Sequence, residues 1–398
     1  MMNKHPEQHA EIVDSVLAFI EKDGCNVIPA KAGNVIPAKA RTVIPAKAGI
    51  QSIQEEAPDS DAFDRLALRL FAYQFTNNQP YRRFCQRRGA TPRNVKRWFD
   101  IPAVPIDAFK ELSLRCQPPS PADRVFMTSG TTRSEVKGRH HHPTLAVYDN
   151  SMTRNFARRF MRGGDRLPMA ILFPTETVMP NSSLAHYLAL AVSEFGTPES
   201  RYFVSPQGLD GAGLCEALAQ SERSGAPFAI LGASFSFVHL MDELRQRGTS
   251  FHLPPGSRIL DTGGYKGQSR ELPLDTFYAE LSAMLGIARS RCINMYGMTE
   301  LSTQFYDDGN ESVPSLKSGP HWIRSRIVDP LSGREVPAGE RGILVHCDLA
   351  NFNSVTTILT EDVGVAMDGG FLLLGRAEGA QAKGCSLAVE EFIRAATA

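Results

Sequence analysis

The chain has 398 residues, a length that fits one large domain with appendages. Hydrophobic residues make up 42% and charged residues 22%, proportions typical of a soluble globular protein. The 43 basic residues balance the 43 acidic ones, which argues against a nucleic-acid or anionic-membrane partner because either needs a basic surface.

The N-terminal region is expected to be helical. Apolar residues at Ile12, Val16, Phe19 and Ile20 have helical spacing and predict a helix over 8–22. The segment before them lacks the apolar core of a signal peptide, and no run in the chain approaches the roughly 18 apolar residues of a membrane span. We therefore expect a cytoplasmic protein without a membrane span.

A short repeat follows this helix. "NVIPAKA" occurs at 26–32 and 34–40, and "TVIPAKA" at 42–48. Three proline-bearing units cannot bury a core of their own, so we expect an exposed, deletable loop over 26–51. A proline-containing recognition segment is the alternative.

The middle of the chain predicts a layered α/β fold. Helical patterns over 62–90 lead into the proline-punctuated connector "IPAVPIDAFKEL" at 101–112. Short apolar runs then alternate with helical patterns, which indicates parallel strands joined by helices. The expected strands are 169–174, 201–205, 228–233, 258–264 and 292–297, and the expected helices are 144–161, 182–195, 211–223, 234–247 and 271–285. Past residue 320, strand-like runs with turn signals predict an antiparallel module.

Cysteine usage argues against cross-links. The seven cysteines are odd in number, scattered and without a CxxC pair, so neither a disulfide framework nor a zinc site is expected. Cys292 and Cys347 lie in strand-like runs and are predicted to be small buried hydrophobes. A reducing compartment would leave at least one thiol free for chemistry.

A polar loop after Val125–Met127 can hold phosphate. Its residues offer backbone N–H groups and hydroxyls that converge on phosphate oxygens, and Lys137 adds a mobile positive charge. The loop residues are Thr128, Ser129, Gly130, Thr131 and Thr132. Arg133 stands where a further glycine is expected, and the spacing is not that of a P-loop. An ordinary polar turn is the alternative.

The stretch "NMYGMTELS" at 294–302 lies at the end of a predicted strand, where ligands bind in open α/β sheets. Tyr296 can stack on a base and Thr299 can bind phosphate. Glu300 can bind magnesium, which takes one or two carboxylates beside phosphates. The alternative is a strand followed by a solvent-facing helix start capped by Thr-Glu.

Together, "MTSGTT…KG" and "YGMTE" resemble the acyl-adenylate-forming superfamily. In the same order, "TEDVG…DGGF" at 360–371 resembles the segment whose aspartate holds the ribose, here Asp362. "GRAE…KGCSL" at 375–387 resembles the hinge, with Arg376 meeting ribose or phosphate and Glu378 as the hinge acid. Gly297 belongs to the "YGMTE" motif.

The resemblance implies an α/β adenylate-forming large domain over 52–374, preceded by the N-terminal helix at 1–25 and the repeat at 26–51. Only 22 residues follow Arg376, so the small C-terminal domain and its catalytic lysine are expected to be almost absent. Residues 375–398 would be a hinge remnant with an acyl-accepting tail. Arg133 would partly offset the missing lysine.

Cys385 follows Gly384 in the hinge position. A thiolate attacks an acyl adenylate to give a thioester that keeps the acyl group activated. Lys383 is expected to lower the pKa of this thiol. Cys385 and Lys137 are therefore the predicted catalytic residues.

The short form with a terminal cysteine resembles the acyl-protein synthetases of the LuxE type. This resemblance covers about 60–398 and also rests on "SGTT…GRHHHP", "PNSSLAHYLALAVSEFG", "DTGGYKGQSREL" and "KGCSL". It implies activation of a fatty acid with ATP and magnesium, storage of the acyl group on Cys385, and delivery to a partner acyl reductase. Two alternatives remain: a ligase that transfers the acyl group to coenzyme A or a carrier protein, and an inactive nucleotide-binding remnant. "SSLAHY" and "GASFSFVHL" are expected to form walls of the acid pocket.

Three consecutive histidines, His140, His141 and His142, raise the possibility of a metal site. Neighbouring residues on an extended chain point to opposite faces, so at most two could share one ion. We expect instead that Arg139 and one histidine face the triphosphate or the acid.

Overall fold

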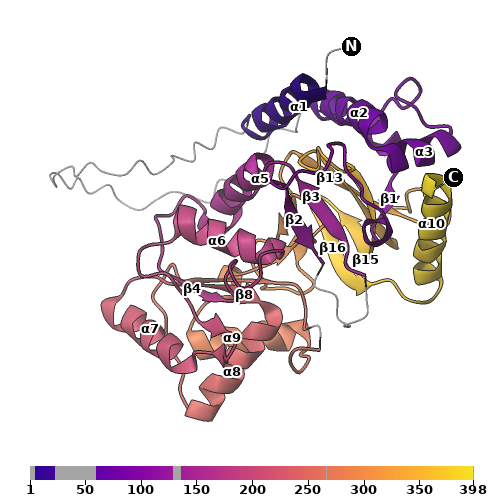
Figure 1. The fold of residues 1–398 in the computed structure, drawn as a ribbon. Coiled ribbons are helices and arrows are strands. Elements are labelled where there is room, and N and C mark those ends of the chain that lie inside the picture. The colour runs from indigo at the N-terminus through magenta and orange to yellow at the C-terminus, as the bar shows by residue number, and fades with distance from the viewer. Residues whose placement is uncertain (1–4, 23–59, 129–135, 266, 398) are drawn as a thin grey trace, which may run out of the picture.

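The computed structural model describes residues 5–22, 60–128, 136–265 and 267–397. Two large β-sheets organise these residues, one mostly parallel and one mostly antiparallel, and Figure 1 shows them in separate halves of the molecule. The VIPAKA repeat and its predicted loop lie outside the described residues.

The mostly parallel sheet has the strand order β11-β10-β9-β8-β4-β5, and only β11 runs antiparallel to its neighbour. Every residue of β4, β8 and β9 is buried, as in parallel sheets that carry helices on both faces. The strands are β4 (Met169–Leu172), β5 (Arg201–Tyr202), β8 (Ala229–Ala233), β9 (Arg258–Thr262), β10 (Cys292–Tyr296) and β11 (Phe305–Tyr306). The five strands predicted by alternation are confirmed.

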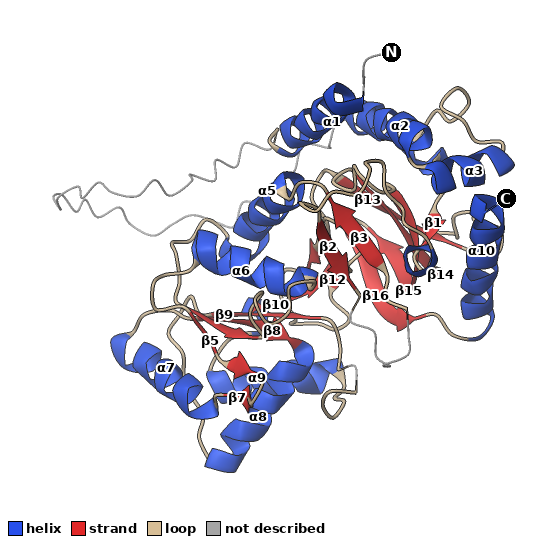
Figure 2. Cartoon of the chain, in the orientation of Figure 1, coloured by secondary structure: helices blue, strands red, loops and turns tan. Residues whose placement is uncertain are grey.

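Helices cover both faces of this sheet, as Figure 2 shows. One apolar cluster joins the sheet to α5 and α6, and another joins it to α7, α8 and α9. These helices are α5 (Ala146–Phe156), α6 (Ser183–Phe195), α7 (Gly211–Ser224), α8 (Ser234–Arg247) and α9 (Leu274–Leu285). The helix predicted over 144–161 continues past α5 as a π-helical turn, Ala157–Met161.

The second sheet has the order β12-β16-β15-β14-β13, with the short β1 pairing parallel to β15. All other pairs are antiparallel, which confirms the module predicted past residue 320. The strands are β1 (Val104–Pro105), β12 (Leu316–Lys317), β13 (Ile323–Val328), β14 (Arg341–Asp348), β15 (Thr357–Met367) and β16 (Gly370–Arg376).

A layer of helices from both ends of the described chain flanks the antiparallel sheet (Figure 1). The largest apolar cluster lies between this layer and the sheet. The helices are α1 (His5–Ile20), α2 (Ser60–Asn77), α3 (Gln79–Arg87), α4 (Ala108–Glu111) and α10 (Gly379–Thr397). None of the helices in these described ranges is long and apolar enough to cross a membrane.

Helix α10 packs against α3. The rings of Phe84 and Phe392 lie 4.7 Å apart, and the Arg88 guanidinium binds both carboxylate oxygens of Glu391 at 2.8 and 2.6 Å. Arg83 Nη1 donates to the Ala396 carbonyl at 2.9 Å. The segment expected to be a tail after the hinge is thus largely a docked helix.

A hairpin of β2 (Arg124–Met127) and β3 (Arg139–His142) carries the predicted phosphate loop. The remaining short elements are the 3-10 turns Trp98–Asp100 and Arg289–Arg291 and the hairpin of β6 (Val204–Ser205) and β7 (Gly208–Leu209).

Candidate active site

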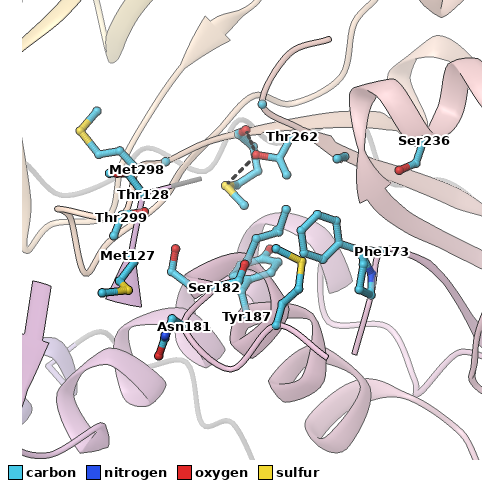
Figure 3. Close-up of a pocket in the computed structure, with 18 of the residues that line it drawn as sticks. Met127, Thr128, Phe173, Asn181, Ser182, Tyr187, Ser236, Thr262, Met298 and Thr299 are labelled. Atoms are coloured by element: carbon cyan, nitrogen blue, oxygen red, sulfur yellow. Dashed lines mark hydrogen bonds between the residues drawn. The ribbon is translucent and has the colours of Figure 1, made fainter. Parts of the chain in front are cut away.

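A cavity of about 670 Å³ opens at the carboxyl ends of the parallel strands, and we call it the strand-end cavity. Residues that end or directly follow β4, β8, β9 and β10 form part of its wall, among them Phe173, Ala233, Thr262 and Gly297. This is the edge at which open α/β sheets bind ligands. Figure 3 shows Thr128, Met298 and Thr299 lying together on one side of this cavity.

The apolar walls of the strand-end cavity come from the two segments predicted to line an acid pocket. Ser182, Ser183, Leu184 and Tyr187 contribute from α6 and its N-terminal end, while Phe235 and Ser236 contribute from α8. Figure 3 shows Phe173 and Tyr187 on the same side of the cavity, opposite Thr262. Both predicted segments line this cavity, and its role as the acid pocket stays a prediction.

The phosphate loop meets this cavity at both of its described ends. Thr128 and Lys137 line the cavity. The loop is closed at its base, because Thr128 N–H donates to the Gly138 carbonyl at 3.1 Å and Gly138 N–H donates to Thr128 Oγ1 at 2.9 Å. The predicted phosphate ligands Ser129, Gly130, Thr131 and Thr132, together with Arg133, lie outside the described residues.

Some residues of the second motif, 294–302, line the cavity, and others are buried behind the cavity wall. Gly297 and Thr299 line the cavity. Tyr296 is buried, and its ring packs against Phe305 and Phe371 with centroids 5.8 Å away in both cases. Stacking of this ring on a base stays a prediction.

The Tyr296 hydroxyl joins two motifs that are distant in sequence. It donates to Asp362 Oδ2 at 2.8 Å. Asp362 and Arg376 are paired across β15 and β16, with Arg376 Nε 3.9 Å from Asp362 Oδ1, and Arg376 Nη1 also reaches Glu361 Oε2 at 3.1 Å. Burial raises the pKa of Asp362, and the Tyr296 hydrogen bond and the Arg376 charge oppose that rise. The structure thus brings three predicted ribose- or nucleotide-binding residues together.

Glu300 lies behind the phosphate loop and is buried. A Cβ added to Gly138 would be 3.0 Å from Glu300 Oε1, so the loop passes close to this carboxylate. Burial raises the pKa of Glu300 to about 7, the Asp107 charge adds to the rise, and Lys110 and Arg376 oppose it.

Asp107 and Lys110 were not predicted as site residues. They form an ion pair of 2.9 Å at α4, inside the connector "IPAVPIDAFKEL". Their charges act on both Glu300 and Glu361. The local pattern of this connector, whose charged residues also include Glu111, does not mark them as site residues.

Two of the three consecutive histidines, His140 and His142, point into the interior, and the prediction that one histidine faces the triphosphate or the acid is not tested. Both are buried on β3, with ring centroids 4.2 Å apart, and neither lines the described wall of the strand-end cavity. His140 Nδ1 lies 3.0 Å from the Thr299 carbonyl and its Nε2 lies 3.2 Å from Ser354 Oγ, so this ring supports the second motif from behind. Burial lowers the pKa of His140 to about 4, which keeps it neutral.

Arg139 is exposed and also does not line the described wall. Within the described ranges, no group of three or more His, Cys, Asp or Glu side chains is arranged to hold a metal ion.

Cys385 lies within α10, and its side chain is buried. The thiol donates to the Thr360 carbonyl at 3.8 Å, two residues before Asp362. Burial raises the pKa of Cys385 to about 11, and the charges of Glu361, Asp107 and Asp362 add to the rise. The expected lowering by Lys383 is wrong, because desolvation and three carboxylates outweigh any cation nearby. Cys292 and Cys347 are buried in strands, as predicted.

Comparison with known proteins agrees with this architecture. The family described as "Acyl-protein synthetase, LuxE" matches residues 50–393. The long-chain-fatty-acid–luciferin-component ligase of Vibrio harveyi is 24% identical over 324 residues, covering 80% of this chain and 82% of that protein. Its counterpart from Aliivibrio fischeri is 21% identical over 318 residues, covering 77% and 79%.

Solved structures of 2-hydroxyisobutyryl-CoA ligase share the fold. One in the postadenylation state with its acyl-AMP has a TM-score of 0.58 at 17% identity, covering 80% of this chain and 68% of that chain. An open conformation with acyl-AMP and CoA also has a TM-score of 0.58, at 16% identity, covering 86% and 81%. The predicted adenylate-forming fold is confirmed. Since the family match spans most of its length, the chain belongs to the LuxE family of acyl-protein synthetases and is a ligase of that type.

Proposed function

We propose that this chain activates a fatty acid with ATP as an acyl adenylate and then carries the acyl group on Cys385 as a thioester. Family membership and the names of the relatives support the activation of a long-chain acid. The observation that carries the proposal is the hydrogen bond between Tyr296 and Asp362, because it joins the second motif at the strand-end cavity to the sheet on which Cys385 packs.

In the adenylation step, the loop Thr128–Thr132 and Lys137 hold the triphosphate while Gly297 and Thr299 contact the adenylate. Asp362 accepts the ribose hydroxyls and Arg376 neutralises charge beside them. A carboxylate oxygen of the acid attacks the α-phosphorus, and pyrophosphate leaves. Catalysis then comes mainly from positioning the reactants and from neutralising charge.

Glu300 fits a magnesium ion, which prefers one or two carboxylates beside phosphate oxygens. A buried carboxyl whose pKa is raised to about 7 gains most from a cation that stabilises its charged form. Magnesium, when bound, would neutralise phosphate charge. Gly138 leaves the space beside Glu300 that the phosphate loop needs.

In the transfer step, the Cys385 sulfur attacks the carbonyl carbon of the adenylate. A C–S bond forms, the C–O bond to phosphate breaks, and AMP leaves with the electron pair. Because the pKa of the thiol is raised to about 11, only a small fraction of it is thiolate at neutral pH, so the proton is lost to solvent before the sulfur attacks.

Incubation with ATP and radiolabelled fatty acid tests this proposal. We expect a hydroxylamine-labile label on the wild-type protein and on Cys215→Ser, whose cysteine is half-buried on α7. Cys385→Ser should keep acid-dependent pyrophosphate exchange and lose the label. A labile thioester on Cys385→Ser would rule out this cysteine as the acyl carrier.

The final acceptor would be an acyl reductase that takes the group from Cys385, as the family resemblance implies. One observation favours a second candidate: the thiol is buried, and a related fold belongs to a ligase solved with CoA. In that candidate an external thiol receives the acyl group directly. Acyl-CoA formation by Cys385→Ser at the wild-type rate would establish it.

A further inference from the structure

A second cavity, of about 440 Å³, lies between α10, β1 and the antiparallel sheet, and we call it the α10 cavity. It shares no described lining residue with the strand-end cavity. One stripe of α10 faces it at helical spacing, formed by Gly384, Leu387, Ala388 and Glu391. The described structure therefore holds two separate spaces, one at the adenylation motifs and one beside the cysteine.

The α10 cavity and the packing around the Cys385 thiol share wall residues, although Cys385 itself does not line the described cavity. Val328, Val345 and Leu359 line the cavity and belong, with Ile343 and Val363, to the apolar cluster into which Cys385 packs. Ala388, one turn further along α10, lines the cavity and packs against the same cluster. A group attached to the sulfur therefore starts on the other side of a wall that it shares with this cavity.

The mouth of the α10 cavity exposes several large apolar side chains among polar groups. Phe99, Leu331 and Leu387 line it and are 37%, 66% and 45% exposed, unusually high for large hydrophobic side chains. The charged rim residues Arg88 and Glu391 are already paired with each other. A ligand with an apolar part would cover these three exposed side chains.

One residue that lines the α10 cavity has a buried polar atom that is unsatisfied. Arg326 lines the cavity, and its Nε is buried without a hydrogen-bond partner in the described part of the chain. Arg326 is paired with Val345 across β13 and β14, so both side chains lie on the same face of the sheet as the thiol cluster.

We propose that the α10 cavity is a second acyl site, which shelters the acyl chain once it is bound to Cys385. This inference rests on the proposed thioester. During adenylation, the chain lies in the strand-end cavity with its carboxyl group at the phosphate loop. After transfer, its head is bonded to a sulfur whose apolar cluster shares Val328, Val345 and Leu359 with the α10 cavity, and each methylene that enters that cavity leaves water. The shelter keeps water from the thioester until an acceptor arrives.

Photo-crosslinking of the loaded full-length enzyme tests the location. The probe is a fatty acid with a diazirine on its terminal carbon, loaded with ATP, and the acylated protein is irradiated after removal of ATP and free acid. Crosslinks should map to the peptides around Val328, Val345 and Leu359. Crosslinks to α6 and α8 would show that the chain stays in the strand-end cavity and would overturn the inference, as would labelling by solvent alone. A protein not acylated on Cys385 would refute the proposed function instead, and intact mass before irradiation separates the two cases.

Cavity-filling variants give a second readout. Ala388→Phe fills the cavity, whereas Ala380→Phe places the same ring on an exposed position of the same helix. We expect pyrophosphate exchange to be unchanged in both. The thioester of Ala388→Phe should hydrolyse roughly tenfold faster with a long chain, as if about two methylenes were returned to water. Leu387→Ala, an exposed position that removes one wall at the mouth, should show a smaller acceleration. Hydrolysis rates that do not depend on chain length or on these substitutions would overturn the second acyl site.

Discussion

The hydrogen bond from Tyr296 to Asp362 can be removed without disturbing the packing around it. Tyr296→Phe deletes one oxygen and keeps the ring that contacts Phe305, His346 and Phe371. The Asp362 side chain is only 16% exposed, so water cannot fully replace the lost donor. The substitution therefore acts chiefly on the charged state and orientation of Asp362.

The magnitude follows from the type of bond. A hydrogen bond to a buried charged group contributes about 1.5–3 kcal/mol, which corresponds to a loss of roughly 10- to 150-fold in kcat/KM for ATP. The bond stabilises the ionised carboxylate, and its removal raises the pKa of Asp362 further above its ordinary value. If the ribose is bound by the ionised form, the fall of activity toward acid pH should begin at a higher pH in the variant.

Acid-dependent ATP–pyrophosphate exchange between pH 5 and 9 measures both effects. Tyr278→Phe is the matched control, because its buried hydroxyl donates to the buried carboxylate of Asp261 at 2.9 Å, away from the described cavity wall. The control should lose stability but keep the KM for ATP. An unchanged KM and an unchanged acid limb in Tyr296→Phe would refute the role assigned to Asp362.

Three other outcomes are expected. Because the pKa of Cys385 is raised to about 11, its thiolate fraction should rise about tenfold per pH unit from 7 to 9. The single-turnover rate of acyl transfer, measured by rapid quench, should rise with it. A plateau near pH 8.5 would contradict this. Gly138→Ala places a Cβ 3.0 Å from Glu300 Oε1. We expect the KM for ATP to rise in the exchange assay and the free energy of unfolding to fall by about 1–3 kcal/mol. An unchanged KM would argue against a role for this close approach. Lys317 Nζ lies 2.6 Å from the buried carboxylate of Asp307, and Lys317→Met leaves that carboxylate without its cation. Denaturant unfolding should show that the free energy of unfolding falls by about 3–5 kcal/mol. A loss below about 1 kcal/mol would match an exposed ion pair instead.

Much of the fold could be predicted because hydrophobic period and turn residues agree with tertiary burial. The parallel strands are continuous apolar runs, and helices α6 to α9 carry one apolar face each. Strand β3 has no such signal, because the residues that it buries are His140 and His142. Helix α10 was missed because glycines at 379 and 384 lower helix propensity. Gly384 is nevertheless required, since a Cβ there would lie 2.9 Å from Pro330 Cγ.

Site residues could be predicted where a sequence motif itself contains the chemical groups. The electrostatic environment of a residue could not be predicted where it depends on how distant segments pack. The strand-end position of Gly297 and Thr299 and the two apolar walls followed from motif and sequence order. The effect of Lys383 on Cys385 could not be judged from adjacency, because burial on the sheet dominates the pKa of the thiol. The part played by Asp107 depends on a connector brought back to β15 by the two-residue strand β1, which no local pattern indicates.

The docking of α10 on α3 has a consequence for biosynthesis. Arg83 and Ala396 are in contact although 313 residues separate them. Helix α3 leaves the ribosome long before α10 exists, so the apolar surface around Phe84 has to wait for its partner. Until that late closure, the thiol of Cys385 has no sheet to cover it, and a nascent or truncated chain would expose it to oxidation. The contacts that bury the thiol in the finished enzyme can thus form only after α10 has been synthesised.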